Sequence, residues 1–409
     1  MQWSKGLTVL VRIAQLLVGA TFLLSSLLKG IDPVGTAIKI GEYGGIISLS
    51  LSNNVTLVAS FLLIVVEWLI GVALVIGYRP NITRWVLLVT MVGMTLLTLY
   101  LYIFEPVSDC GCFGDALVIS NRATFLKNLV LLAAALLLFY HSNGWYHWIY
   151  GRSGDIVVAI GVVVMILFGG MNVRHLPVID FRPYKVGSDL MELTQTGGTE
   201  GEYIYRFVYR KGDKEETFGI DEIESLDDSW TFVRDDVEEV RAPIPPAGAS
   251  FILLRNDGTN VVESLAYEGQ MALLLIAPEV TKVSPDLLRE LADSHLPITL
   301  VTGSSGDIWQ YPEYQGLDKS FVEVLFLDHT TAKTVVRSNP GLVVIKGGKI
   351  VNKLSISDLL GRIRTNEFKE NPYQSRSSTD EVLRYLSTFG IIGLYVVILL
   401  FLGIYIRKK

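Results

Sequence analysis

Six long apolar runs constrain the fold of this chain more than any other feature of its sequence. Each approaches the ~20 residues that a helix needs to cross the hydrocarbon core of a bilayer. The runs are Leu7–Leu28, Val55–Tyr78, Trp85–Phe104, Thr124–Tyr140, Ile156–Met171 and Phe389–Ile406. They predict a polytopic α-helical membrane bundle with six transmembrane helices. A further apolar segment, Thr36–Leu51, is interrupted by glycine, and we interpret it as interfacial or re-entrant.

The short loops predict the orientation of these helices, because cytoplasmic loops carry an excess of Lys and Arg. A cytoplasmic N-terminus places most of the basic loop residues inside, including Arg79, Arg84 and Arg152. An even number of spans then places both termini in the cytoplasm. We therefore predict a multi-pass membrane protein, in contact with lipid, whose long polar segment faces the same outer compartment as the loop between the third and fourth runs. If the membrane is the inner membrane of a bacterium, that compartment is the periplasm, which is oxidising.

That polar segment has the character of a globular protein, since hydrophobic runs alternate there with charged stretches and turns. Half of the whole chain is hydrophobic and 19% is charged, a mixture that indicates two regions of unlike character. The net charge of −6 and the lack of a basic stripe give no reason to expect a nucleic-acid partner. We predict the following division of the chain: a four-helix membrane domain at 1–150, a fifth transmembrane helix at 151–174, a small β-rich subdomain at 175–244, an α/β domain at 245–370, a linker at 371–386 and a last transmembrane helix with a basic tail at 387–409.

The two cysteines of the chain lie one residue apart, in the loop between the third and fourth apolar runs. A disulfide between Cys110 and Cys112 closes too small a loop to stabilise the fold greatly. We therefore favour a thiol–disulfide switch, with Gly111 supplying the backbone freedom that so small a ring needs. A structural pair and a metal site remain alternatives, and no further ligand predicts a metal. The flanking Asp109 disfavours the thiolate form if it lies close.

The segment 250–364 resembles the membrane-tethered thioredoxin-like domains of the periplasm. The resemblance rests on Ser338-Asn339-Pro340-Gly341, followed by a strand pattern that turns at Gly347-Gly348. It implies a cis peptide before Pro340 and a partner-binding role for Asn339 and Pro340. The family's redox cysteines would lie near 277–283, where this chain has none. Without a thiolate, the domain cannot by itself exchange disulfides.

The membrane half resembles the DoxX-like group, and within it the MauE-type proteins associated with disulfide formation. The residues that carry this resemblance are Leu28-Lys29-Gly30-Ile31-Asp32-Pro33, Glu67 with Gly71, and the string Asp109–Gly114, followed by Arg122 and Asn128. The resemblance covers about 7–140 and implies a four-helix core. The combination of such a bundle with a cysteine-less thioredoxin-like domain is similar to proteins found in Bacteroidetes.

Three further polar residues fall inside the apolar runs and are candidates to support the cysteine pair. Glu67 lies deep in the second run, where an ionisable group suggests function or a polar contact between helices, with Arg12 or Lys29 as partner. Lys127 and Asn128 lie one turn into the fourth run, beside the cysteine loop. They could bond the loop or the headgroup of a quinone, and snorkelling also explains the lysine.

Two hypotheses of different classes follow. In the first, the chain is an inner-membrane thiol–disulfide oxidoreductase that cycles Cys110 and Cys112, while its soluble domain recognises a partner. That partner, a periplasmic or membrane protein, must supply a second thiol pair, and a quinone is a candidate acceptor although no cofactor is certain. In the second, the chain is a non-catalytic scaffold or assembly factor whose soluble domain binds proteins.

Overall fold

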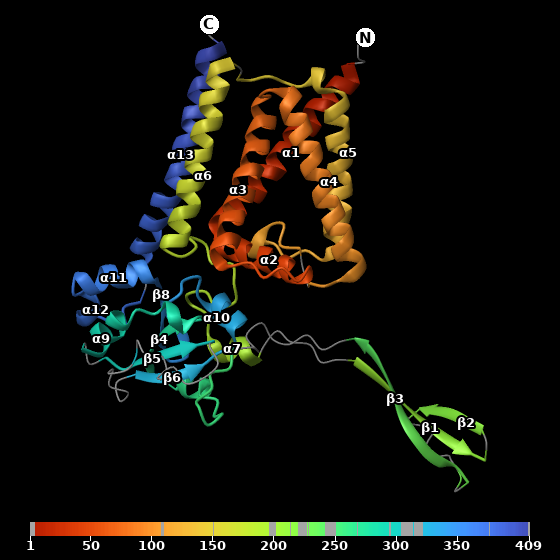
Figure 1. The fold of residues 1–409 in the computed structure, drawn as a ribbon, viewed down its shortest axis with the longest axis vertical. Coiled ribbons are helices and arrows are strands. Elements are labelled where there is room, and N and C mark those ends of the chain that lie inside the picture. The colour runs from red at the N-terminus through yellow and green to blue at the C-terminus, as the bar shows by residue number, and fades with distance from the viewer. Residues whose placement is uncertain are drawn as a thin grey trace.

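The computed structural model of the chain describes residues 5–107, 110–149, 151–195, 202–212, 214–219, 227, 229–241, 251–267, 269–293, 296–303, 314, 322–375 and 377–407. It contains a helical bundle, a domain built on a five-stranded sheet, and a separate three-stranded sheet (Figure 1).

Six helices are long and apolar enough to cross a membrane, which confirms the predicted spans. They are α1 (Lys5–Ile31), α3 (Asn53–Ile76), α4 (Pro80–Phe104), α5 (Asn121–Tyr140), α6 (Gly151–Arg174) and α13 (Ser378–Arg407). One apolar core joins α1, α3, α4 and α5, and a second joins α1 and α3 to the paired helices α6 and α13. The chain is therefore built as a multi-pass membrane protein.

The two ends of the bundle differ. Both termini lie at one end, and the sheet domain and the loop after α4 lie at the other (Figure 1). Helix α2 (Pro33–Ile46), which overlaps the segment Thr36–Leu51 expected to be interfacial or re-entrant, lies across this second end. The predicted relation between termini, cysteine loop and soluble segment is thus confirmed, and the compartment that each end faces stays a prediction.

Local sequence explains where the helices near the cysteine loop begin. Asp32 caps α2, since its Oδ1 accepts a hydrogen bond from the Gly35 amide at 2.8 Å, and Pro33 occupies the first helical turn. Ser52 caps α3 and Ser120 caps α5 in the same way. These caps fix the helix ends that surround the loop.

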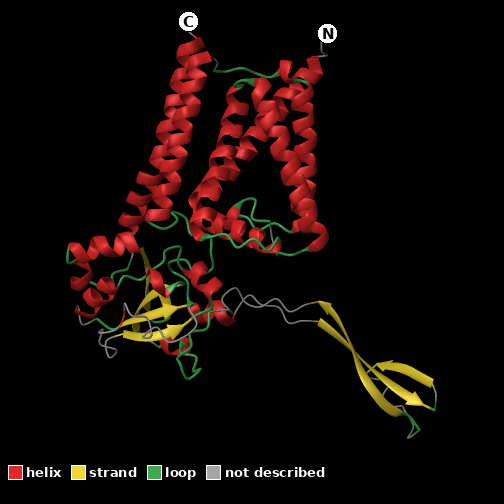
Figure 2. Ribbon diagram, in the orientation of Figure 1, coloured by secondary structure: helices red, strands yellow, loops and turns green. Residues whose placement is uncertain are grey.

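The five-stranded sheet has the order β6-β5-β4-β7-β8. Strands are drawn in yellow in Figure 2. The strands of this sheet are β4 (Met271–Ala277), β5 (Ile298–Thr302), β6 (Val322–Phe326), β7 (Gly341–Lys346) and β8 (Lys349–Ser355). Strands β4, β5 and β6 are parallel, and β7 and β8 form an antiparallel hairpin beside β4. The helices of this domain are α7 (Leu190–Gln195), α9 (Pro285–Asp293), α10 (His329–Val335), α11 (Ile356–Arg364) and α12 (Glu367–Glu370), with the short helices η3 (Val262–Ala266) and η4 (Val280–Lys282).

The sheet is buried on both faces, which explains the continuous apolar run of β4. Leu274 and Ile276 enter one hydrophobic cluster, while Leu273 and Leu275 enter the cluster on the opposite face. Successive side chains of a strand point to opposite faces, so a strand covered on both sides needs apolar residues throughout. The expected cis peptide between Asn339 and Pro340 is confirmed.

Two features of the soluble part concern its predicted division, which stays a prediction. The three-stranded sheet, in the order β2-β1-β3, consists of β1 (Glu202–Lys211), β2 (Lys214–Gly219) and β3 (Thr231–Arg241). The earlier part of the predicted β-rich subdomain packs elsewhere, because Tyr184 and Leu190 lie in a core of the five-stranded sheet. Helix α13 begins at Ser378, within the predicted linker 371–386, because the polar residues there continue the helix of the last span.

Candidate functional site

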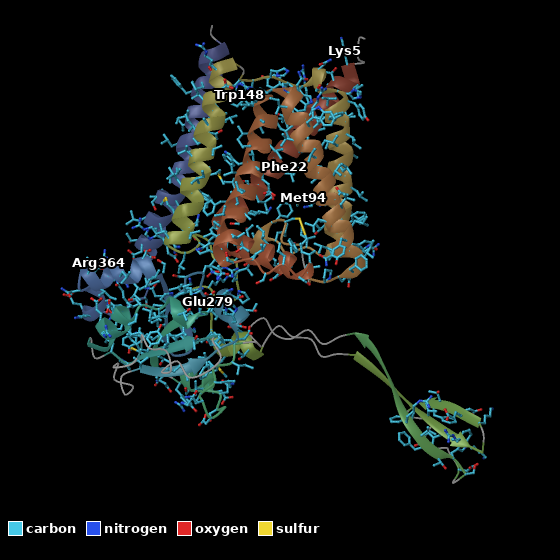
Figure 3. The ribbon with its side chains drawn as sticks, in the orientation of Figure 1. Lys5, Phe22, Met94, Trp148, Glu279 and Arg364 are labelled. Atoms are coloured by element: carbon cyan, nitrogen blue, oxygen red, sulfur yellow. A yellow bond between two sulfur atoms is a disulfide. The ribbon has the colours of Figure 1, made fainter. Side chains whose placement is uncertain are left out.

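The cysteine pair lies in a compact loop at the end of the bundle nearest the sheet domain. Cys110 and Cys112 are joined as a disulfide, with their Cα atoms 5.5 Å apart. Gly111 between them has a φ of +61°, a conformation that favours glycine. Both cysteines are buried, at 7% and 8% exposure, and pack with Leu101 and Phe113. Figure 3 shows the disulfide as a yellow bond close to the labelled Met94, which packs against the same cluster.

A buried lysine holds this loop to the bundle. Lys29, at the end of α1, places its Nζ 2.9 Å from Oε1 and 3.0 Å from Oε2 of Glu67 on α3. The same ammonium donates to Ser25 Oγ at 2.6 Å and to the carbonyl oxygen of Cys112, which also accepts from Ser25 at 2.9 Å. The predicted polar role of Glu67 therefore has Lys29 as its partner. Arg12, the other candidate, instead lies over the Tyr146 ring.

The remaining candidates of the fourth run lie beside the same loop. Lys127 places its Nζ 4.4 Å from the centre of the Phe113 ring, a cation–π contact. Asn128 is buried and donates to Thr98 Oγ1 on α4 at 3.1 Å, so it joins two helices instead of bonding the loop. A cavity of about 30 Å³, the size of one water molecule, is lined by Cys112 together with Glu67, Lys127 and Asn128.

The sheet domain contacts the cysteine loop through Arg337, which follows α10. Its Nε lies 2.9 Å from Asp32 Oδ2, and its Nη2 lies 2.7 Å from Asp115 Oδ2. Asp115 belongs to the short helix η1 (Gly114–Ala116), three residues after Cys112. The guanidinium is almost fully buried, and burial of such a charge requires paired partners of this kind. One arginine thus ties the soluble domain to the helix end and to the loop of the bundle.

A second set of buried charges supports Arg337 from within the sheet domain. Asp180 accepts from Arg182 Nε and from Lys353 Nζ, both at 2.8 Å. Burial acts to raise the pKa of Asp180, but the charges of Arg182 and Lys353 lower it to about 2. Burial, followed by the charge of Arg182, lowers the pKa of Lys353 to about 7 against the attraction of Asp180. Arg337 and Arg182 also lower the pKa of Asp32, although burial opposes them.

The predicted partner-binding residues belong to the sheet domain, where they directly precede β7. Asn339 lies two residues after Arg337, before Pro340, and lines a cleft between the sheet domain and the bundle. Asp109 lies outside the described residues. Within the part of the chain that the structure describes, no group of three or more His, Cys, Asp or Glu side chains could hold a metal ion.

Residues 7–141 match the family described as methylamine utilisation protein MauE. This match confirms the MauE-type resemblance and covers α1 to α5, and so includes the cysteine loop and the Lys29–Glu67 pair. Residues 203–242 match a domain of unknown function (DUF8463), which covers the three-stranded sheet. No curated protein and no solved structure matches the chain.

Sequence reasoning missed the contacts that join the MauE-like region to the sheet domain. Asp32 stands within the Leu28–Pro33 motif, and Arg337 directly precedes the Ser338–Gly341 motif. Each motif therefore lies in or next to a segment that takes part in the contact. Their pairing could not be foreseen, because it joins residues separated by 305 positions.

Proposed function

We propose that this protein is a membrane-embedded thiol–disulfide oxidoreductase that cycles Cys110 and Cys112 between disulfide and dithiol. The observation that carries the proposal is the disulfide held against a buried ion pair. Lys29, fixed by Glu67, bonds the Cys112 carbonyl, and Glu67, Lys127 and Cys112 share one small cavity. Positive groups beside a sulfur favour its thiolate form, which is the leaving group when a disulfide opens.

The exchange balances with a partner dithiol as reductant. A partner thiolate attacks one sulfur of the pair, forming a mixed disulfide and releasing the other cysteine as a thiolate. The second partner thiol then closes the partner's own disulfide and leaves Cys110 and Cys112 reduced. Two electrons and two protons have moved, and a lipid-soluble acceptor such as a quinone takes them, becoming a quinol, as the pair reoxidises.

In this proposal the five-stranded domain is a thioredoxin-like module that recognises the partner. Its strand order and its mixture of three parallel strands with an antiparallel hairpin support this interpretation. The module itself carries no cysteine, so the second thiol pair must come from another protein. We place this activity at the periplasmic face of the bacterial inner membrane.

Alkylation trapping in intact membranes tests the proposal. Wild-type protein is equilibrated with redox buffers of increasing potential and labelled with a maleimide that adds mass to each free thiol. We expect a reversible two-thiol transition, and a mixed disulfide with a second protein in Cys110→Ser or Cys112→Ser. The double variant Cys110→Ser/Cys112→Ser is the control that must show neither. A pair that stays fully bonded or fully reduced at every potential contradicts the proposal.

A non-catalytic scaffold is the second candidate, and the burial of both cysteines favours it. In that case the pair fastens the loop, and the sheet domain binds proteins without electron transfer. Wild-type function from Cys110→Ser/Cys112→Ser, measured by growth of a deletion strain, supports the scaffold.

A further inference from the structure

A large cleft lined by described residues lies where the sheet domain meets the bundle, and the proposed redox chemistry does not use it. Its volume is about 630 Å³, which is in the range of small-molecule sites, and such sites often lie between domains. Helices α2 and α3 line one side. The segment after β4, helix α10 and the turn at Asn339 line the other. In Figure 3 the labelled Glu279 marks the sheet-domain side of this junction.

The two walls of the cleft differ in chemistry. The wall from α2, α3 and the loop between them presents the apolar side chains of Ile38, Leu51 and Leu57. The wall from the sheet domain presents Lys282 and Lys333. A ligand that satisfies both walls must be amphiphilic. Because α2 lies across the end of the transmembrane helices, the cleft stands at the depth where lipid headgroups gather (Figure 1).

The charges of the cleft favour an anion. Of its two acidic side chains, Glu42 pairs with Lys39 at 3.0 Å, whereas Glu279 accepts a hydrogen bond from the neutral amide of Asn53 and keeps its charge. Arg337 is bound to Asp32 and Asp115. Among the described residues, no carboxylate forms an ion pair with Lys282 or Lys333. Two ammonium groups therefore remain for a ligand that carries negative charge.

We propose that this cleft binds an anionic glycerophospholipid of the surrounding membrane. The phosphate lies between Lys282 and Lys333, and an acyl chain covers the apolar wall. Basic pockets at the ends of transmembrane helices recognise anionic headgroups in this way. The proposal is independent of the redox function, since none of these residues touches the disulfide.

Native mass spectrometry of the full chain in detergent tests the proposal with three probes. Lysophosphatidic acid carries the whole set of groups, monoacylglycerol lacks the phosphate, and glycerol 3-phosphate lacks the chain. We expect lysophosphatidic acid to bind at least tenfold more tightly than either of the others. Equal binding of monoacylglycerol would overturn the anionic part of the proposal, and equal binding of glycerol 3-phosphate would overturn the lipid part.

Variants locate the site. Lys282→Ala/Lys333→Ala should weaken lysophosphatidic acid binding at least tenfold, whereas the matched control Lys346→Ala/Lys349→Ala, at the exposed turn between β7 and β8, should leave it unchanged.

Gly41 lines the cleft, and a Cβ there would meet only Thr56 at an ordinary 3.7 Å. Gly41→Ala should therefore retain binding and Gly41→Phe should block it. Undiminished binding by a folded Gly41→Phe, or capture of a peptide in place of lipid, would reject the lipid site.

Discussion

Arg337 of the sheet domain donates its Nη2–H to Asp115, 2.7 Å away and three residues beyond Cys112. The same guanidinium reaches Asp32, three residues after Lys29. The soluble domain therefore holds both ends of the network that fixes the cysteine loop. Arg337 therefore joins the sheet domain directly to the segment that follows Cys112.

Removing this side chain should expose the cysteine loop. In Arg337→Ala, Asp32 and Asp115 lose their shared buried partner and repel each other, so the loop separates from the sheet domain. We expect the rate at which an added thiol reduces the Cys110–Cys112 disulfide to rise at least fivefold, measured by timed alkylation. Arg255→Ala is the control, because it removes an exposed ion pair with Glu323 elsewhere in the same domain. An unchanged rate would show that Arg337 does not restrain the loop.

The Lys29–Glu67 pair should be essential for stability. Lys29→Met leaves the Glu67 carboxylate buried without its partner, a change that typically costs about 3–5 kcal/mol. We expect a lower thermal unfolding temperature in detergent, with a smaller loss in the double variant Lys29→Met/Glu67→Leu, which removes both charges. Arg79→Met breaks the exposed pair with Asp155 and should have much less effect. A double variant less stable than Lys29→Met would contradict this account.

Gly111 should tolerate no side chain. Its φ of +61° disfavours an alanine, and the added Cβ would also lie 3.1 Å from Lys39 Cγ. We expect Gly111→Ala to destabilise the protein by about 1–2 kcal/mol. Gly212→Ala separates the two causes, because Gly212 has a φ of +63° with no atom within 4 Å of the added Cβ. Chemical unfolding that gives equal losses for both variants would remove the steric part of the explanation.

Lys353 should make stability depend on pH above neutrality. Its pKa is about 7 when folded, whereas an unfolded lysine titrates near 10.5. Between these values the unfolded chain binds more protons, so the unfolding free energy rises with pH, by at most about 1.4 kcal/mol per unit. Thermal unfolding from pH 7 to 9.5 should show this rise in wild type and a flatter profile in Lys353→Met. Parallel profiles would contradict the low pKa.

The transmembrane helices were predictable because the backbone of a chain inside a bilayer must satisfy its own hydrogen bonds. A long apolar run meets this requirement as a helix. The run Val55–Tyr78 corresponds closely to helix α3, and Glu67 within it could be identified as a residue that needs a partner. The β-rich subdomain was less predictable. Its expected early part, around Tyr184 and Leu190, packs on the other sheet, because burial against a distant core outweighs chain proximity.

Some residues of the candidate site could also be predicted from the sequence, and others could not. Spacing alone identified Cys110 and Cys112, and the motif around Lys29 offered one of two possible partners for Glu67. The depth of each side chain in the bundle decides whether Lys29 or Arg12 pairs with Glu67, and this depth depends on how the helices pack in three dimensions. Asn128 shows the converse, since its place in the sequence suggested the loop while its helical face directs it to Thr98 on α4. Contacts between separate domains, such as that of Arg337 with Asp32, produce no periodic pattern in the sequence and so could not be predicted from it.

The sheet domain is inserted between α6 and α13, which pack against each other and against the rest of the bundle. Both of its ends are therefore anchored in the membrane beside the loop that it contacts. Such a double tether makes docking intramolecular and sets a high effective concentration of the domain at the bundle. A few buried ion pairs then suffice to keep it docked, and a partner that competes for Arg337 could release it locally without ever letting it diffuse away.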